Sequence, residues 1–272
     1  MAIVFRVMPW YKKSGGGGYS GIWVPKDWSS GKTPIYGGSY IWTDGTNIYY
    51  SNGDWLNQYV LNKSTGIWES KTWYGLTNFV GVYIWTDGTD IYYSNGSSYQ
   101  YVLDKSTSTW SKKTWYGVTN LYGLYIWTDS TNIYLSEETT TRTTHRVLDK
   151  NTSTWSRITW EGTKPNAPDI WTDGTDFYYS NNTNQYVLDK ATSTWTAKTW
   201  TGLTSFSGEY VWTDGTDIYY SKDANQYVLD KATSTWSAKT WSGLTSFSGF
   251  YIWKDGNHIY YSNGSSSQYE LT

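Results

Sequence analysis

The fold is decided by the stretch from Tyr83 to Tyr93, which reads Tyr-Ile-Trp-Thr-Asp-Gly-Thr-Asp-Ile-Tyr-Tyr. Two apolar runs rich in Trp, Tyr and Ile flank an Asp-Gly pair, and these residue types favour strands. Asp-Gly is a strong signal for a two-residue hairpin turn in which both turn residues have positive φ. The stretch therefore predicts two antiparallel strands joined by a tight turn at Asp87-Gly88.

The same pattern recurs six times in the 272 residues. Its tryptophans are Trp42, Trp85, Trp127, Trp171, Trp212 and Trp253. The intervals between them are 43, 42, 44, 41 and 41 residues. A period of ~40–50 residues is typical of propeller blades, and helical periodicity is absent.

Each unit contains four apolar runs. In the second unit they cover residues 83–86, 91–94, 100–103 and 109–115, and turn residues separate them. The runs beside Asp-Gly are apolar at nearly every position, which indicates that both faces of the sheet are covered. We therefore predict an all-β fold: a six-bladed β-propeller of four-stranded antiparallel blades, with the six repeat tryptophans in its core.

The sixth unit ends at Thr272 without a fourth run, and the N-terminal part of the chain supplies a match. Trp23 to Trp28 has the Trp-x-x-Lys-x-Trp spacing of Trp236 to Trp241. We predict that residues 20–28 complete the sixth blade and close the ring, which removes an open edge. The propeller then spans residues 20–272 as one domain. Residues 1–19 form an extension with a Gly-rich linker and either an extra strand on the sixth blade or an arm that contacts a partner.

Two segments of the repeat carry a resemblance to a known family. Ile91 to Gly96, followed by Tyr101 to Trp110, resembles a kelch repeat, with Ser-Asn-Gly in place of the usual double glycine. The segment Leu-Asp-Lys-x-Thr-x-x-Trp recurs at Leu103, Leu148, Leu188 and Leu229, and Asn62 replaces the Asp after Leu61. The resemblance implies a propeller over nearly all of residues 20–272 and no particular activity. The low-charge repeats also resemble those of viral or phage receptor-binding proteins and bacterial surface adhesins, which implies a virion or surface location.

Composition argues against several classes of function. The net charge is −2 and the lysines are scattered, which argues against nucleic-acid partners. No apolar run approaches the ~18 residues of a membrane span, and the first residues do not read as a signal peptide. Since there is no cysteine, disulfides and thiolate metal sites are excluded. His145 and His258 fall in different blades, so we expect no metal site, no cofactor and no catalytic set.

Two alternatives to a binding function stay open. Glutamates at positions 137, 138, 161 and 209 could meet across the ring as the paired carboxylates of a hydrolase or lyase acting on polysaccharide. The ring could also be a scaffold that is monomeric by itself and joins a larger assembly through residues 1–19.

The leading hypothesis is a non-catalytic module that binds a glycan or a surface protein. The first-to-second and third-to-fourth connections of the units barely vary, whereas the second-to-third and fourth-to-first connections do. In a four-stranded blade the two variable classes lie on one side, and loops on a rigid scaffold carry specificity. Aromatic side chains beside polar ones suit recognition. The candidate ligand-binding residues are Trp55, Tyr99, Asn120, Tyr122, Arg142, His145, Glu161, Asn166 and Glu209.

Overall fold

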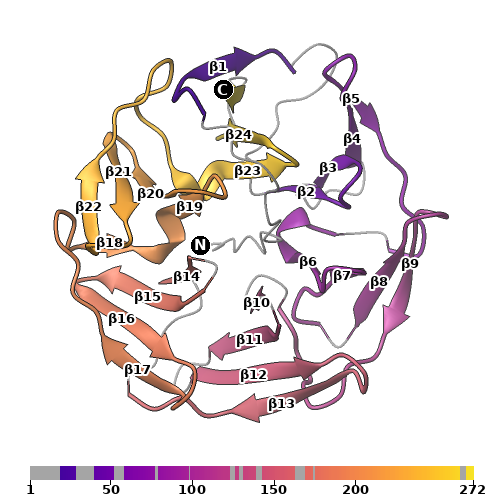
Figure 1. Ribbon diagram of the computed structural model, residues 1–272. Helices are drawn as coiled ribbons and strands as arrows, with labels where there is room; N and C mark the ends of the chain where they lie inside the picture. Colours follow the sequence, from indigo (N-terminus) through magenta and orange to yellow (C-terminus); the bar gives the residue numbers. More distant parts are fainter. Residues whose placement is uncertain are drawn as a thin grey trace.

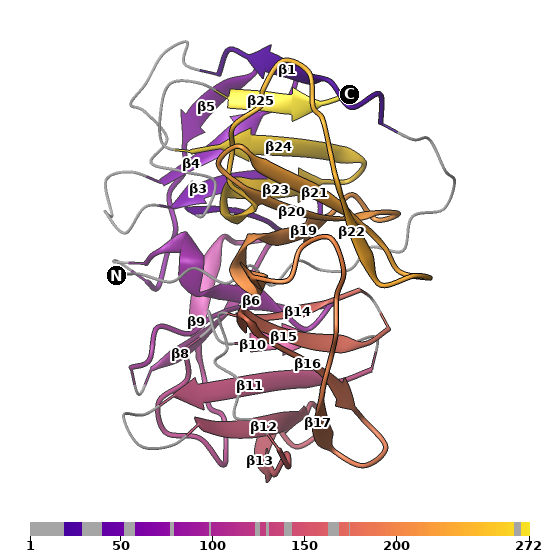
Figure 2. The same cartoon turned by 90° about the vertical axis from the view of Figure 1, so that its left-hand side faces the viewer.

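The chain forms a ring of six β-sheets around a central axis, as Figure 1 shows for the computed structural model. The structure describes residues 19–28, 40–51, 58–76, 79–97, 99–122, 126–128, 131–138, 143–162, 169–173, 175–263 and 268–272. Figure 2 shows the ring from its side, with the first and sixth blades at the top. The prediction of a six-bladed propeller is confirmed.

Each blade is an antiparallel sheet whose first strand lies nearest the axis. The first three blades contain β2 (Ile41–Thr43), β3 (Ile48–Ser51), β4 (Gln58–Asn62) and β5 (Ile67–Ser70); β6 (Ile84–Thr86), β7 (Ile91–Tyr93), β8 (Gln100–Asp104) and β9 (Thr109–Lys113); and β10 (Ile126–Thr128), β11 (Ile133–Glu138), β12 (Thr143–Asp149) and β13 (Thr154–Ile158).

The other three blades follow the same order around the ring. They contain β14 (Ile170–Thr172), β15 (Phe177–Asn182), β16 (Asn184–Asp189) and β17 (Thr194–Ala197); β19 (Val211–Thr213), β20 (Ile218–Lys222), β21 (Asn225–Asp230) and β22 (Thr235–Ala238); and β23 (Ile252–Asp255), β24 (His258–Ser262), β25 (Gln268–Leu271) and β1 (Trp23–Lys26). The short strand β18 (Phe206–Ser207) adds to β15, and the 3₁₀ turns η2 (Gly81–Tyr83), η5 (Gly208–Tyr210) and η6 (Gly249–Tyr251) precede β6, β19 and β23.

One hydrogen bond recurs in every blade. The indole Nε1 of the repeat tryptophan donates to a fully buried serine Oγ on the next strand or directly after it, over 2.8–3.1 Å. The pairs are Trp42–Ser51, Trp85–Ser94, Trp127–Ser136, Trp171–Ser180, Trp212–Ser221 and Trp253–Ser262. Five of these tryptophans are buried as predicted, and Trp127 is half-buried. Because a buried indole N–H needs a partner, the serine fixes the ring in one orientation.

The Asp-Gly turns differ from the prediction. In the second blade the last strand pair before the turn is Thr86↔Ile91, so the turn contains four residues instead of two. Gly88 has positive φ, at 93°, while Asp87 does not. The Asp87 carboxylate instead accepts the backbone N–H groups of Thr89 and Asp90, at 2.9 and 2.8 Å. The two-residue turn was wrong here because an Asp side chain can close the wider turn from within.

The ring is closed by the N-terminal strand, as predicted. β1 pairs with β25 in the register Trp23↔Leu271, which repeats the pair Trp236↔Leu229 of the fifth blade. The backbone N–H of Thr272 donates to the carbonyl of Ile22 over 2.9 Å. The expected strand within residues 1–18 lies outside the described residues.

Ion contacts reinforce this closure across three strands. Glu270 on β25 contacts Lys26 of β1 and the Nδ1 atom of His258 on β24. Burial alone would raise the pKa of Glu270, but hydrogen bonds from Lys26 and His258 hold it below its usual value. The closing strand is therefore held by charge as well as by backbone pairing.

Neighbouring blades are joined by backbone hydrogen bonds after the fourth strand. The backbone N–H of Tyr74 donates to Ser108, and the N–H of Trp110 donates back to Tyr74, at 3.0 and 2.8 Å. The same short parallel bridge recurs at Tyr116↔Thr154, Glu161↔Thr194, Thr201↔Thr235 and Ser242↔Ile22. The glycine that follows has positive φ at each, and a Cβ atom on Gly75 would lie 2.1 Å from the Trp110 carbonyl oxygen. The Trp-x-Gly sequence therefore fixes how adjacent blades meet.

Candidate functional site

The ring has two sides with different kinds of connection. The first-to-second connections of the six blades and the third-to-fourth connections of the first five lie at one end of the strands, which we call the turn side. The second-to-third and fourth-to-first connections lie at the other end, which we call the loop side. This division follows from the antiparallel order of each blade.

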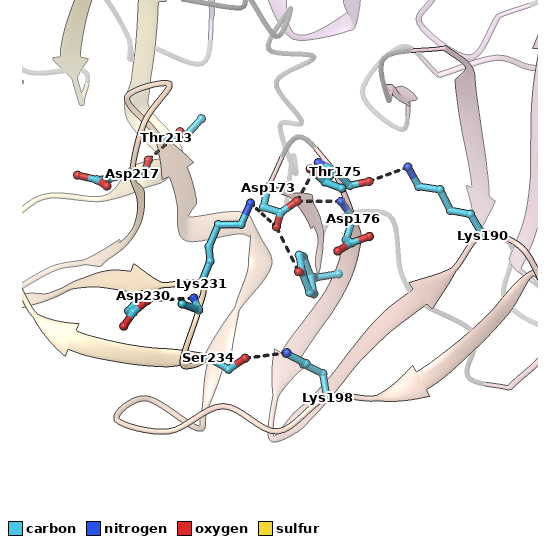
Figure 3. A network of polar contacts seen from close by, with 12 residues as sticks. Asp173, Thr175, Asp176, Lys190, Lys198, Thr213, Asp217, Asp230, Lys231 and Ser234 are labelled. Atoms are coloured by element: carbon cyan, nitrogen blue, oxygen red, sulfur yellow. Dashed lines mark hydrogen bonds and ion pairs between the residues drawn. The ribbon is translucent and has the colours of Figure 1, made fainter. Parts of the chain in front are cut away.

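Lysines on the turn side connect neighbouring blades. Lys231, in the third-to-fourth turn of the fifth blade, forms an ion pair of 2.8 Å with Asp173 in the first turn of the fourth blade, as Figure 3 shows. Lys63–Asp255 is the same contact between the first and sixth blades. Lys105 and Lys150 reach the backbone carbonyls at the equivalent positions, Asp44 and Asp87. The uniform sequence of these turns therefore has a structural cause.

The carboxylate of Asp173 is held in its charged form. Burial alone would raise its pKa, but backbone N–H groups of Asp176 and Thr175 and the Lys231 ammonium together hold the pKa below its usual value. A second lysine contact crosses the same blade boundary near the rim, where Lys198 donates to Ser234 over 2.8 Å (Figure 3). The turn side thus carries several contacts between neighbouring blades.

The loop side differs from blade to blade. The second-to-third connections of the fourth and fifth blades are two-residue turns, closed by the pairs Asn181↔Asn184 and Lys222↔Asn225. In the second blade the strands end earlier, at Tyr93↔Tyr101, so the connection from β7 to β8 is longer. The strands of the fold are therefore common to these blades, while the loop lengths are not.

An aromatic and polar patch covers the loop side of the second blade. The ring of Tyr122 lies directly over Gly96, where a Cβ atom would come within 2.0 Å of it. The backbone N–H of Gly96 donates to the carbonyl of Leu121 over 2.8 Å, which fixes the two loops together. Tyr122 is 41% exposed, its ring centroid is 6.3 Å from that of Tyr83, and Asn120 beside it is exposed. We call Tyr83, Tyr99, Asn120 and Tyr122 the second-blade patch.

Tyr99 belongs to the same loop but faces a strand. Its ring is 54% exposed and carries the Lys112 ammonium 4.3 Å from its centroid. The carbonyl of Tyr99 accepts from the Ser97 hydroxyl over 2.9 Å, so the loop holds its own shape. The structure therefore places three of the predicted residues, Tyr99, Asn120 and Tyr122, around one loop.

Glu161 and Glu209 lie in different layers of the ring. Glu161 is exposed at the outer junction of the third and fourth blades, where its backbone pairs with Ser193 and Trp195. Glu209 lies in η5, beside the inner strand of the fifth blade. Burial and a hydrogen bond to Glu209 raise the pKa of Tyr210. The structure does not bring these two glutamates together as the paired carboxylates of a hydrolase.

A carboxylate that was not predicted from the sequence contacts Ser207, two residues before Glu209. Asp169 stands immediately before β14, where the described copies elsewhere have Tyr40, Tyr83, Tyr210 and Tyr251. It is buried and accepts from Asn181 and Ser207, at 2.9 and 2.7 Å. An alignment of the repeats could have identified Asp169, because it replaces a Tyr that occupies this position in the other copies.

His145 was predicted to lie in an exposed variable loop, and this was wrong. It lies within β12 with 6% exposure, its ring 4.2 Å from that of Trp160 and its Nδ1 atom 2.9 Å from Ser136 Oγ. Burial lowers the pKa of His145 to about 4. Aligning His145-Arg146-Val147-Leu148 with Gln185-Tyr186-Val187-Leu188 places it where the other blades have a buried Gln, and this alignment could have corrected the prediction.

The remaining predicted residues Trp55, Arg142 and Asn166 lie outside the described residues. Within the residues that are described, no cluster of His, Cys, Asp or Glu is arranged to hold a metal ion. In the same part of the chain, no helix has the length and apolar character needed to cross a membrane.

A hollow of about 410 Å³ lies on the fifth blade, at the edge formed by Asp217, Asp230 and Lys231. Lys231 there is already paired with Asp173.

Comparison with known proteins supports the fold. Neither a protein-family model nor a curated protein matches the sequence. Among solved structures, the ring is similar to the extracellular domain of a protein described as a hybrid two-component system from B. thetaiotaomicron, with a TM-score of 0.50 and 13% identity. The match covers 91% of this chain and 35% of that chain, so this chain spans about a third of that domain's length. The similarity shows the propeller fold alone, and the kelch resemblance stays a prediction.

Proposed function

We propose that this chain is a non-catalytic binding module that recognises a glycan through the second-blade patch. The observation that carries the proposal is the Tyr122 ring, exposed on its outer side and supported from below by the backbone of Gly96. A ring that is already fixed costs little entropy when a ligand stacks on it. Aromatic rings stack on the apolar faces of sugars, and neighbouring amides and hydroxyls bind sugar hydroxyl groups.

The polar groups around Tyr122 fit this ligand class. Asn120 is exposed on the same connection, and Ser97 lies in the loop below. The one cation near the loop, among the contacts of the described residues, is Lys112 over Tyr99. A mainly uncharged surface favours a neutral glycan over an acidic one.

A glycan array with the unmodified protein and with Tyr122→Ala, Tyr99→Ala and Asn120→Ala tests the proposal. We expect Tyr122→Ala to weaken binding at least tenfold, equivalent to about 1.4 kcal/mol, with smaller losses for the other two. Ser205→Ala is the matched control, because Ser205 occupies the position of Asn120 in the next-but-one connection. Unchanged binding in all three patch variants, or binding to proteins without glycans, would contradict the proposal.

A further inference from the structure

We infer that the outer rim of the ring carries a second carbohydrate-binding surface, formed by Tyr74 and Tyr116 and suited to a neutral linear polysaccharide. Both residues occupy the middle position of a Trp-Tyr-Gly sequence, one at the junction of the first and second blades and the other at the next junction. Neither belongs to the second-blade patch, so this surface is separate from the proposed site.

The two rings are more exposed than any other large apolar side chains of the described residues. Tyr74 is 60% exposed and Tyr116 is 61% exposed. At the equivalent junctions the chain has Glu161, Thr201 and Ser242. Since small and polar residues make the same backbone bridge, the junction does not require Tyr for packing.

The backbone of each tyrosine is hydrogen-bonded to the next blade through both its N–H and its carbonyl. Tyr74 uses its N–H and its carbonyl in bonds to the next blade, and Tyr116 does the same with Ser153 and Trp155, at 2.9 and 2.8 Å. The glycine that follows, Gly117, leaves no room for a side chain, since a Cβ atom would lie 2.1 Å from the Trp155 carbonyl oxygen. Each ring is therefore presented from a rigid position, which lowers the entropic cost of stacking.

The spacing of the two rings favours a polymer. They are 116 − 74 = 42 residues apart in the chain, which is one blade. Equivalent positions in neighbouring blades are related by a rotation about the propeller axis. The two tyrosine side chains therefore have the same orientation relative to the outer rim. A chain of repeating sugar units offers an equivalent face to each, whereas a small ligand can use only one.

Hydroxyl side chains lie near the two tyrosines, and the nearby lysines are hydrogen-bonded to serines. Lys71 and Lys113, which precede these junctions, donate to Ser108 and Ser153, at 2.7 and 3.0 Å. Thr109 and Thr154 are the bridge partners of the two tyrosines. Hydroxyl groups beside an aromatic face match a neutral polysaccharide better than an anionic polymer.

The test is affinity electrophoresis of the intact protein in gels that contain a soluble β-1,3-glucan, a hydroxyethylated β-1,4-glucan, a galactomannan or an arabinoxylan. We expect at least one of these polymers to retard the protein, and Tyr74→Thr with Tyr116→Thr to abolish the retardation. Thr is chosen because Thr201 fills this position in the fourth blade, so the variant should fold. Tyr74→Phe with Tyr116→Phe should retain retardation, and Thr201→Ala is the matched control.

The outcomes separate this inference from the proposed function. If the Thr variants bind polymers like the unmodified protein, or if none of the four polymers retards the unmodified protein, the rim surface is refuted. If Tyr122→Ala loses glycan-array binding while the rim variants keep it, the second-blade patch is supported independently. If the rim variants lose polymer binding while Tyr122→Ala binds the glycan array like the unmodified protein, the rim surface stands and the proposed patch fails.

Discussion

The turn side and the loop side of this ring are built on the same strands but differ in what their side chains contact. On the turn side, lysines such as Lys231 and Lys63 bind the preceding blade. On the loop side of the second blade, Tyr122 lies over Gly96 of the neighbouring loop and Tyr99 lies beside Lys112, and much of each ring is exposed. Contacts between blades therefore account for the uniform sequence of the turn side. The Trp-x-Gly junctions also join neighbouring blades, and their sequence is also uniform apart from the middle residue.

The largest effect is expected at a blade junction. Gly202 has a φ of 81°, and a Cβ atom there would lie 1.8 Å from the carbonyl oxygen of Trp236. Gly202→Ala should therefore lower the free energy of unfolding by about 3 kcal/mol or more, measured by denaturant unfolding. The control is Gly88→Ala, with a φ of 93° but open space around it, which should cost about 1 kcal/mol. Equal losses would show that the close approach between blades contributes nothing.

A pH-dependent effect is expected from His145. Its folded pKa of about 4 lies below the unfolded value near 6.5, so the unfolded chain binds more protons between these values. Stability should fall as pH decreases through this window, by about 2 kcal/mol at pH 5. His145→Gln, which installs the residue of the other blades, should remove this loss. Thermal unfolding at pH 8 and pH 5 measures it, and an unchanged pH profile would contradict the buried position.

A smaller effect is expected from the turn-side ion pair. Lys231→Ala should lower the free energy of unfolding by about 1–2 kcal/mol at pH 7, because it leaves the buried Asp173 carboxylate without its cation. The loss is not larger because Lys231 is exposed and solvent already weakens the ion pair. The Asp173 pKa is lowered in the fold, so this contribution is present above the unfolded pKa of ~3.9 and disappears as pH falls through the folded pKa. Lys222→Ala is the control, since the Lys222 ammonium lies over the Tyr210 ring of its own blade. A loss as large in the control would argue against a contact between blades.

The smallest effect on stability is expected on the loop side. Asn120→Ala should change the free energy of unfolding by less than about 0.5 kcal/mol, because the residue is exposed. The comparison of the two sides predicts that this variant alters glycan binding while its thermal unfolding matches that of the unmodified protein. A clear loss of stability would mean that the loop side also holds the fold.

The sequence predicts the ring, its six-fold repeat and its closure because these depend on periodic patterns of apolar residues and on one repeated spacing. The match between Trp23 and Trp236 placed the closing strand in its observed register. The width of the Asp-Gly turn depends on side-chain hydrogen bonds from Asp87, which composition does not reveal. The position of His145 required alignment to the repeat rather than attention to its residue type.

The candidate site was only partly predictable for a similar reason. Exposed aromatic and polar residues in variable connections pointed to Tyr99, Asn120 and Tyr122. The support that Gly96 gives to Tyr122 depends on two loops meeting, which no local pattern encodes. Glu161 and Glu209 looked alike as isolated carboxylates, yet they lie at the rim and near the axis because blades are arranged radially.

The closing pair of strands has a mechanical consequence. β1 and β25 are antiparallel, and Trp23 lies opposite Leu271, so the chain leaves the pair at the same end on both strands. A force that separates the segments next to Ile22 and Thr272 would load one hydrogen bond at a time, as when a zipper opens, instead of all of them in shear. The bonds that Ser20, Gly21 and Ile22 make to Thr272 would carry that load first, with the contacts of Glu270 following as the strands part.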